Sequence, residues 1–160
     1  MKPLLKTNAL EIRTASATLV EPLSIELWPG EVLTIIGETG SGKSLFAQGV
    51  VGNLPPGLQA HGQIDFASGF SEEGRQRGRQ ALWGREIAVL PQEPWLSLDP
   101  TMRARQQVCE TYQHVVGKGR QDALRLARRD MAQLGLEHAE TKFPFQLSGG
   151  MAQGLAFAAT

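Results

Sequence analysis

The sequence predicts an α/β protein, and three observations along the chain support that class. Residues 10–27 alternate loosely between apolar and polar, which is typical of short, half-buried strands. Residues 32–36, VLTII, are apolar and rich in β-branched side chains, which predicts a central strand covered on both faces. Residues 102–116 and 121–134 show helical periodicity. An antiparallel β layer, a strand-and-helix core and a helical region are therefore expected in this order.

The N-terminal half is predicted to place one helix among several strands. The Trp-Pro-Gly turn at 28–30 leads into the strand at 32–36. After a glycine-rich loop, apolar residues at helical spacing predict a helix that ends before Pro55. GQIDF, at 62–66, is typical of another strand, and the glycine- and charge-rich residues 67–79 are expected to form an exposed connection with little to bury.

The C-terminal half is predicted to be mainly helical. EIAVL, at 86–90, indicates one more buried strand before the proline-rich stretch that follows. In the helix at 121–134 an apolar stripe lies opposite several arginines, and Gly135 is well placed to terminate it. The stripe consists of Leu124, Ala127, Met131 and Leu134. A last helix is expected to start near Met151, with Ser148 at its N-terminus.

Composition argues against several classes of protein. The 160 residues carry 16 Lys+Arg and 16 Asp+Glu, so the net charge is zero and gives no overall reason to expect a nucleic-acid partner. No apolar run approaches the roughly 20 residues that span a bilayer. The single cysteine, Cys109, cannot form an internal disulfide, and the three histidines show no metal-ligand spacing. We therefore expect a cytoplasmic protein.

One motif points directly to phosphate binding. Residues 37–44, GETGSGKS, match G-x-x-x-x-G-K-[ST] between a predicted strand and a predicted helix. Glycines let successive backbone N–H groups turn toward a triphosphate, Lys43 supplies a charge to the β- and γ-phosphates, and Ser44 supplies a hydroxyl to Mg²⁺. The predicted nucleotide-binding residues here are Gly37, Glu38, Thr39, Gly40, Ser41, Gly42, Lys43 and Ser44.

A second glycine motif, LSGGM at 147–151, has two interpretations. A serine and two glycines at a helix start can bind an anion through backbone N–H groups, a hydroxyl and the helix dipole. Read alone, the same residues are equally well a helix cap. Its occurrence in one chain with GETGSGKS favours an anion site.

With GETGSGKS, a Gln at the end of a predicted strand in VLPQEP, and LSGGM in this order, the chain resembles the nucleotide-binding subunit of an ABC transporter. PQEPWLSLDP and LSGGMAQ are most similar to the ATPases of bacterial peptide and nickel importers. The resemblance implies a P-loop NTPase core with an N-terminal antiparallel β layer and a helical subdomain. It implies the divisions 1–95 for the β layer and Walker A core, 96–147 for the helical subdomain, and 148–160 for the signature and the helix it opens.

The resemblance also implies roles for particular residues. Gly37 to Ser44 are then the Walker A motif, and Gln92 is the Gln-loop residue that reaches Mg²⁺ together with Ser44. Ser148, Gly149 and Gly150 are then the signature that closes over the nucleotide of a partner. The implied cofactors are ATP and Mg²⁺, and the implied partners are a second ABC ATPase subunit, packed head to tail as a homo- or heterodimer, and transmembrane permease subunits. The implied location is cytoplasmic, at the inner face of the cell membrane.

The family's catalytic carboxylates have no counterpart here. The Walker B strand, with its aspartate and glutamate, and the switch histidine follow the helix that the signature opens, and the sequence stops within that helix. We therefore expect an incomplete core, no catalytic residue in these 160 residues and no ATP turnover by them alone. No aromatic residue precedes Trp28, so no adenine-stacking side chain is identified.

Three functions remain open from the sequence. The first is the ATP-binding subunit of an importer for a peptide or nickel. The second is a module that responds to nucleotide without hydrolysing it. The third is an ABC-type ATPase that works without a membrane partner, although the short segment between Gln92 and Ser148 shows neither a second cassette nor a coiled-coil insertion.

Overall fold

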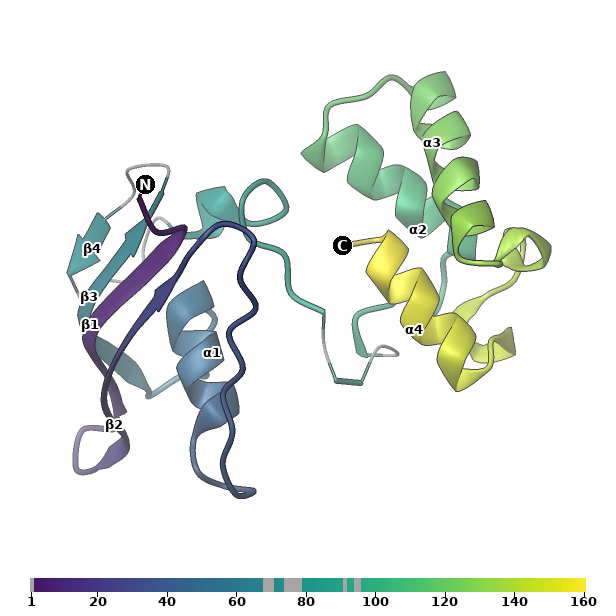
Figure 1. Cartoon of the computed structure of the whole chain (residues 1–160). Helices are drawn as coiled ribbons and strands as arrows, with labels where there is room; N and C mark the ends of the chain where they lie inside the picture. Colours follow the sequence, from purple (N-terminus) through teal and green to yellow (C-terminus); the bar gives the residue numbers. More distant parts are fainter. Residues whose placement is uncertain (1, 68–70, 74–78, 91, 94–95) are drawn as a thin grey trace. The chain divides into compact units, whose positions relative to one another are not determined.

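The computed structural model describes residues 2–67, 71–73, 79–90, 92–93 and 96–160. The chain divides into two compact units, Met1–Ala81 and Leu82–Thr160. The first unit contains the sheet and helix α1, and the second is mainly helical (Figure 1). The expected division at 1–95, 96–147 and 148–160 stays a prediction.

The first unit is built on a four-stranded antiparallel sheet in the order β2-β1-β3-β4. Its strands are β1 (Leu5–Arg13), β2 (Thr18–Leu27), β3 (Gln59–Phe66) and β4 (Ser71–Glu73). This confirms the predicted N-terminal β layer and the strand at 62–66. The layer is antiparallel because β1 pairs with β2 across a short turn and with β3 on its other side.

An irregularity in β1 decides which of its side chains face the core. The register shifts after Thr7, and Ala9 has a φ of 49°, which is unusual for a residue other than glycine. Beyond this bulge Leu10 and Ile12 are fully buried. On the neighbouring strand, Gly62 has a φ of 103°, and a Cβ there would collide with the Ala9 carbonyl. Glycine is therefore required opposite the bulge.

Helix α1 (Lys43–Val51) covers one face of this sheet. Its residues Phe46 and Val50 are buried, as are Leu10 and Ile12 of β1 and Ile64 of β3. The helix ends at Gly52, which has a φ of 82° and lies before the prolines, as the sequence predicts. The sheet and α1 thus hold the glycine-rich loop that precedes the helix.

The predicted central strand at 32–36 is wrong as a description of this structure. Residues 31–38 form no strand, and Val32 and Ile36 are 92% and 89% exposed. A parallel central strand is stable only when neighbouring strands satisfy its backbone and cover its faces. Within the described part of the chain, no strand pairs with these residues. Their apolar composition is therefore not enough to form a strand.

Two further expectations in this region need correction. Residues 86–90 are not a buried strand, because only a bridge between Trp83 and Ile87 forms and Val89 is 54% exposed. The connection at 67–79 lies partly outside the described residues, but Arg79 at its end is fully buried. A charged side chain therefore contributes to the core where the sequence predicts exposure.

The second unit consists of short helices around a single apolar cluster (Figure 1). It contains α2 (Ala104–Glu110), which continues into the π-helical turn η3 (Thr111–Val115), α3 (Arg120–Gln133) and α4 (Gly149–Ala158). Single turns of 3-10 helix occur at η1 (Arg79–Leu82), η4 (Glu137–Ala139) and η5 (Pro144–Gln146). The three predicted helices of this half are confirmed.

The core of the second unit matches most of the predicted stripe. Ala127 and Met131 are fully buried and Leu124 packs against the cluster, whereas Leu134 is 39% exposed. Leu134 is the C-cap of α3, and the chain turns away from the helix at Gly135, which has a φ of 68°. Val108 of α2 and Leu155 of α4 complete the cluster from the other two helices. Among the described helices, none is both long and apolar enough to cross a membrane.

Candidate nucleotide-binding site

The glycine-rich loop at 37–44 leads directly into α1 and is exposed along most of its length. Gly40 and Gly42 have φ values of 86° and 88°, which L side chains rarely adopt. A Cβ at Gly42 would also lie 2.7 Å from Cγ2 of Val20, and one at Gly37 would lie 2.8 Å from Oγ of Ser41. The loop therefore needs glycine for its own backbone path, which turns back on itself ahead of the helix.

The side chain of Lys43 folds back over this loop. Its Nζ donates hydrogen bonds to the carbonyl oxygens of Gly37 at 2.8 Å and Glu38 at 2.5 Å, and to Oγ of Ser41 at 3.2 Å. An ammonium group has three protons to donate, so the loop itself can satisfy all of them. The positive charge of Lys43 is thereby held at the centre of the loop.

The start of α1 is suited to an anion. The Gly42 N-cap makes no side-chain capping bond, and the first turn contains no acidic residue. The first N–H groups of a helix lack intrahelical partners and carry the positive end of the helix dipole. Together with the charge of Lys43, they make this end of the helix electropositive and able to hold phosphate groups.

The residues present also fit a nucleotide-bound Mg²⁺. Ser44 lies in the first turn of α1 and is exposed, so its hydroxyl is accessible beside the loop. No group of three or more His, Cys, Asp or Glu side chains suited to a metal ion occurs among the described residues. Mg²⁺ commonly uses one or two protein oxygens together with substrate phosphates and water, so a single hydroxyl is compatible with such a site.

Gln92 is exposed and lies in a bend of the second unit, whereas the glycine-rich loop belongs to the first. Asp99, seven positions farther along the chain, is bonded to Gln107 of α2, which is buried. The Gln107 amide accepts a hydrogen bond from the Asp99 N–H at 3.0 Å and donates to the Asp99 and Met102 carbonyls. The Gln107 amide thus fixes residues 99–102 against α2. An approach of Gln92 to the phosphates stays a prediction.

The second glycine motif forms the N-terminus of α4, as expected. Ser148 is the N-cap, and its Oγ accepts a hydrogen bond from the Met151 N–H at 3.3 Å. Gly149 and Gly150 are exposed, and a Cβ at either would meet nothing within 4 Å. In contrast to Gly37 and Gly42, no packing within this chain explains glycine here. The open surface leaves room for a close approach by another molecule.

The segment that leads to Ser148 is held against the start of α2. The N–H of Ala104 donates to the Lys142 carbonyl at 2.8 Å, and the N–H of Arg105 donates to the Glu140 carbonyl at 3.1 Å. The Glu140 carboxylate also accepts hydrogen bonds from Arg105 at 2.7 Å and Arg128 of α3 at 3.2 Å. Burial alone would raise the pKa of Glu140, but these two guanidinium groups outweigh it and lower the pKa.

Sequence reasoning did not find the Arg105–Glu140–Arg128 network or the buried Gln107. Arg105 and Glu140 are 35 positions apart, and neither belongs to a motif. The one local sign of such a network is the group of arginines on α3, which from the sequence alone is expected only to lie opposite the apolar stripe. These contacts depend on the tertiary packing of α2 against α3.

The α/β fold and the glycine-rich motif are those of a P-loop protein, and comparison with known proteins places the chain in a family. Residues 20–160 match the sequence pattern described as "ABC transporter". The chain belongs to the ABC transporter family. This confirms the resemblance stated from the motifs and the α/β fold class.

Individual relatives show which ABC transporter proteins the chain is similar to. The chain is 34% identical over 153 residues to the oligopeptide transport ATP-binding protein AmiE of Streptococcus pneumoniae, covering 92% of this chain and 43% of AmiE. It is 32% identical over 164 residues to the nickel import ATP-binding protein NikD of Brucella abortus, covering 96% of this chain and 60% of NikD. The chain thus spans about half the length of these relatives.

A solved structure shows the same fold. cbiO1 from Clostridium perfringens, described as part of the ABC transporter complex cbiONQ, matches with a TM-score of 0.74 at 24% identity. The match covers 99% of this chain and 61% of that one. At this level of identity the likeness concerns the fold.

Proposed function

We propose that the chain binds ATP at residues 37–44, as the nucleotide-binding part of an ABC-type importer ATPase. The observation that carries this proposal is the electropositive loop at the start of α1, with Lys43 at its centre and no acidic residue in the first turn. Membership of the ABC transporter family supports ATP as the nucleotide. On binding, the phosphates would replace the Gly37 and Glu38 carbonyls as partners of the Lys43 ammonium.

Substitution of Lys43 tests this proposal. We expect Lys43→Ala to weaken ATP binding at least tenfold, about 1.4 kcal/mol, because the charged donor at the phosphates is removed. Isothermal titration of the 160-residue chain with ATP and Mg²⁺ measures the effect, and Lys118→Ala is the control because Lys118 is exposed in the other unit. Equal affinity in both variants would exclude the loop as the nucleotide site.

Ser44 and Gln92 are proposed to supply oxygen ligands to the Mg²⁺ that accompanies ATP. Ser44 is supported by its place in the first turn of α1, and Gln92 by the family pattern after a strand-like segment. The metal would neutralise phosphate charge, while the chain positions the phosphates through backbone N–H groups and Lys43. These 160 residues present no carboxylate that we assign to the attacking water.

Ser148, Gly149 and Gly150 are proposed to contact the nucleotide of a second subunit. The support is that both glycines face open space at the N-terminus of α4, where no contact within the chain demands them. A γ-phosphate held between two chains would stabilise a head-to-tail dimer that ATP favours and hydrolysis releases.

Gly149→Ala separates this role from folding. The added methyl meets nothing within 4 Å and alanine is the better helix former, so we expect folding stability to be unchanged or slightly raised. We expect the association constant of the dimer in the presence of ATP, measured by analytical ultracentrifugation, to fall at least tenfold. The reason is that the added methyl would obstruct the phosphates of the nucleotide bound to the second subunit. If the variant associates as the unmodified chain does, or if ATP promotes no association, the signature role is refuted.

The names of the relatives support a peptide or nickel importer as the whole assembly. In such an assembly this part would lie at the cytoplasmic face of the membrane and contact permease subunits through the surface near Gln92 to Arg105. Co-purification of the full-length protein with permease subunits from membranes, lost when that surface is substituted, is the corresponding experiment.

A further inference from the structure

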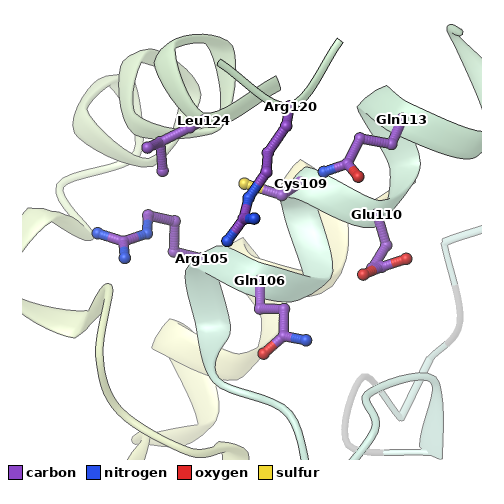
Figure 2. Close-up of a pocket in the computed structure, with 7 residues that line it drawn as sticks. All are labelled: Arg105, Gln106, Cys109, Glu110, Gln113, Arg120 and Leu124. Atoms are coloured by element: carbon purple, nitrogen blue, oxygen red, sulfur yellow. The ribbon is translucent and has the colours of Figure 1, made fainter. Parts of the chain in front are cut away.

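A cavity of about 510 Å³ lies in the second unit, beside α2, η3 and the start of α3 (Figure 2). Its polar lining residues include Arg105, Gln106, Gln113 and Arg120, and its less polar ones are Cys109 and Leu124. Its volume is within the range of sites for small molecules. None of the residues that line it belongs to the proposed nucleotide site.

The charges around the cavity are unbalanced toward positive. Among the described residues, Glu110 is the one acidic side chain that lines it, against two arginines, and its carboxylate lies 2.8 Å from Nε2 of His114. Arg105 shares Glu140 with Arg128, so two guanidinium groups face one carboxylate. Arg120 takes part in none of the ion pairs found among the described residues. In Figure 2 its side chain extends from the start of α3 toward α2.

The chemistry of the lining residues selects for one kind of ligand. A guanidinium presents several N–H donors in a plane that matches the two oxygens of a carboxylate or the oxygens of a phosphate. The amides of Gln106 and Gln113 can donate further hydrogen bonds. Leu124 and the Cys109 thiol provide a surface on which a short carbon chain can pack.

We propose that this cavity binds the oxyanion group, a carboxylate or a phosphate, of a small organic molecule, with Arg120 as its main cationic anchor and Arg105 as the second. The proposal does not depend on ATP binding at residues 37–44. A ligand here would contact α2, η3 and α3 together, and so would stabilise their packing by mass action.

Cys109 makes the cavity directly measurable. It is the only cysteine in the chain and lines the cavity with 9% of its surface exposed. The rate of its alkylation by iodoacetamide therefore reports access to this one place. The experiment uses the full 160-residue chain carrying Lys43→Ala, which weakens the phosphate binding proposed at residues 37–44, and compares succinate with glycerol phosphate at constant ionic strength.

We expect at least one of the two compounds to slow alkylation threefold or more, with saturation. Arg120→Gln should raise the half-saturating concentration at least tenfold. The matched control is Arg125→Gln, because Arg125 is exposed on the same helix and pairs with Asp122 but does not line the cavity. Protection by succinate alone identifies a carboxylate site, and protection by glycerol phosphate alone identifies a phosphate site.

Three results would overturn the proposal. The first is that neither compound protects Cys109 in a saturable way, and the second is that both protect the chain equally with and without Arg120→Gln. The third is that Arg120→Gln and Arg125→Gln raise the half-saturating concentration equally. Circular dichroism verifies the fold of each variant. Gln113→Leu provides the same comparison should Arg120→Gln fold poorly, since it removes a donor from the cavity and retains the side-chain volume. Because the assay already lacks Lys43, its failure says nothing about nucleotide binding.

Discussion

Arg79 is a charged residue that the first unit buries completely. Its guanidinium donates hydrogen bonds to the carbonyls of Gly49 and Val50, at 3.0 Å for Val50, in the last turn of α1. The last carbonyls of a helix lack intrahelical donors and carry partial negative charge, which a cation compensates. Arg79 therefore stabilises the end of the helix whose other end forms the candidate phosphate site.

We predict that Arg79→Met lowers the free energy of unfolding by about 2 to 3 kcal/mol. The substitution keeps much of the side-chain volume but leaves two helix carbonyls without this donor in a buried place. Urea unfolding followed by circular dichroism measures the loss. Arg85→Met is the control, since Arg85 is exposed and its loss should change stability by less than about 0.5 kcal/mol. Equal effects of the two substitutions would show that Arg79 does not support α1.

Two of the helices contain a glycine in the interior, and their surroundings differ. In α4, a Cβ at Gly154 would lie 3.4 Å from Cδ1 of Leu136, which is an ordinary contact. In α1, a Cβ at Gly49 would lie 2.5 Å from Cδ1 of the fully buried Ile12. Helix propensity favours alanine at both positions, so the difference in packing decides the outcome.

We predict opposite effects for the two alanine substitutions. Gly154→Ala should raise the free energy of unfolding by about 1 kcal/mol, because the helix gains propensity without a clash. Gly49→Ala should lower it by about 1 kcal/mol or more, because the fully buried Ile12 side chain or the helix itself must shift to make room for the added methyl. Thermal and urea unfolding of both variants provide the comparison. A stabilising Gly49→Ala would mean that α1 does not pack against Ile12 so closely.

At the scale of the whole molecule, each unit depends on contacts between residues far apart in the chain. In the second unit, Glu140 connects Arg105 of α2 to Arg128 of α3, and its carboxyl is about one-fifth exposed. The two arginines lower the pKa of Glu140 despite its partial burial. A lowered pKa in the folded state means that the ionised carboxylate stabilises the fold above the pKa of the unfolded chain.

We predict that Glu140→Gln costs about 1 to 2 kcal/mol of stability at pH 7. The difference between the two proteins should be constant at neutral pH and shrink as the pH falls below about 4.3, the ordinary value for glutamate, because the wild-type carboxylate then becomes protonated. Urea unfolding from pH 7 to pH 3 measures this. The control is Glu137→Gln, because Glu137 is exposed. If the stability difference between the wild type and Glu140→Gln grows toward acid, the stabilising role of the ionised Glu140 carboxylate is contradicted.

Much of the candidate site could be predicted from sequence because its motifs are local. Gly37 to Ser44 fix a loop through glycine conformations and the helix that starts at Lys43, and Ser148 caps α4 through its own neighbour Met151. Such interactions span a few residues and leave a pattern in the sequence. The amphipathic stripe of α3 is predictable for the same reason, since its period follows from helix geometry.

The apolar segments at 32–36 and 86–90 show where local pattern is insufficient. A strand exists only through hydrogen bonds to other strands, and within the described residues the former pairs with nothing while the latter forms one bridge at Ile87. The burial of Arg79 and the pairing of Glu140 likewise depend on distant partners, since Gly49 lies 30 positions from Arg79 and Arg105 lies 35 positions from Glu140. Hydrophobicity indicates which residues can be buried but not which neighbours they have.

The sequence by itself determined the family, the glycine-rich loop at 37–44, the Ser148 cap of α4 and most helix positions, because each of these leaves a pattern in a short stretch of chain. The tertiary structure decided which apolar segments become strands, where Arg79 and Glu140 find their partners, and that residues of α2, η3 and α3 together line a cavity with two arginines. These features arise only when distant segments pack together, so no short stretch of sequence contains them.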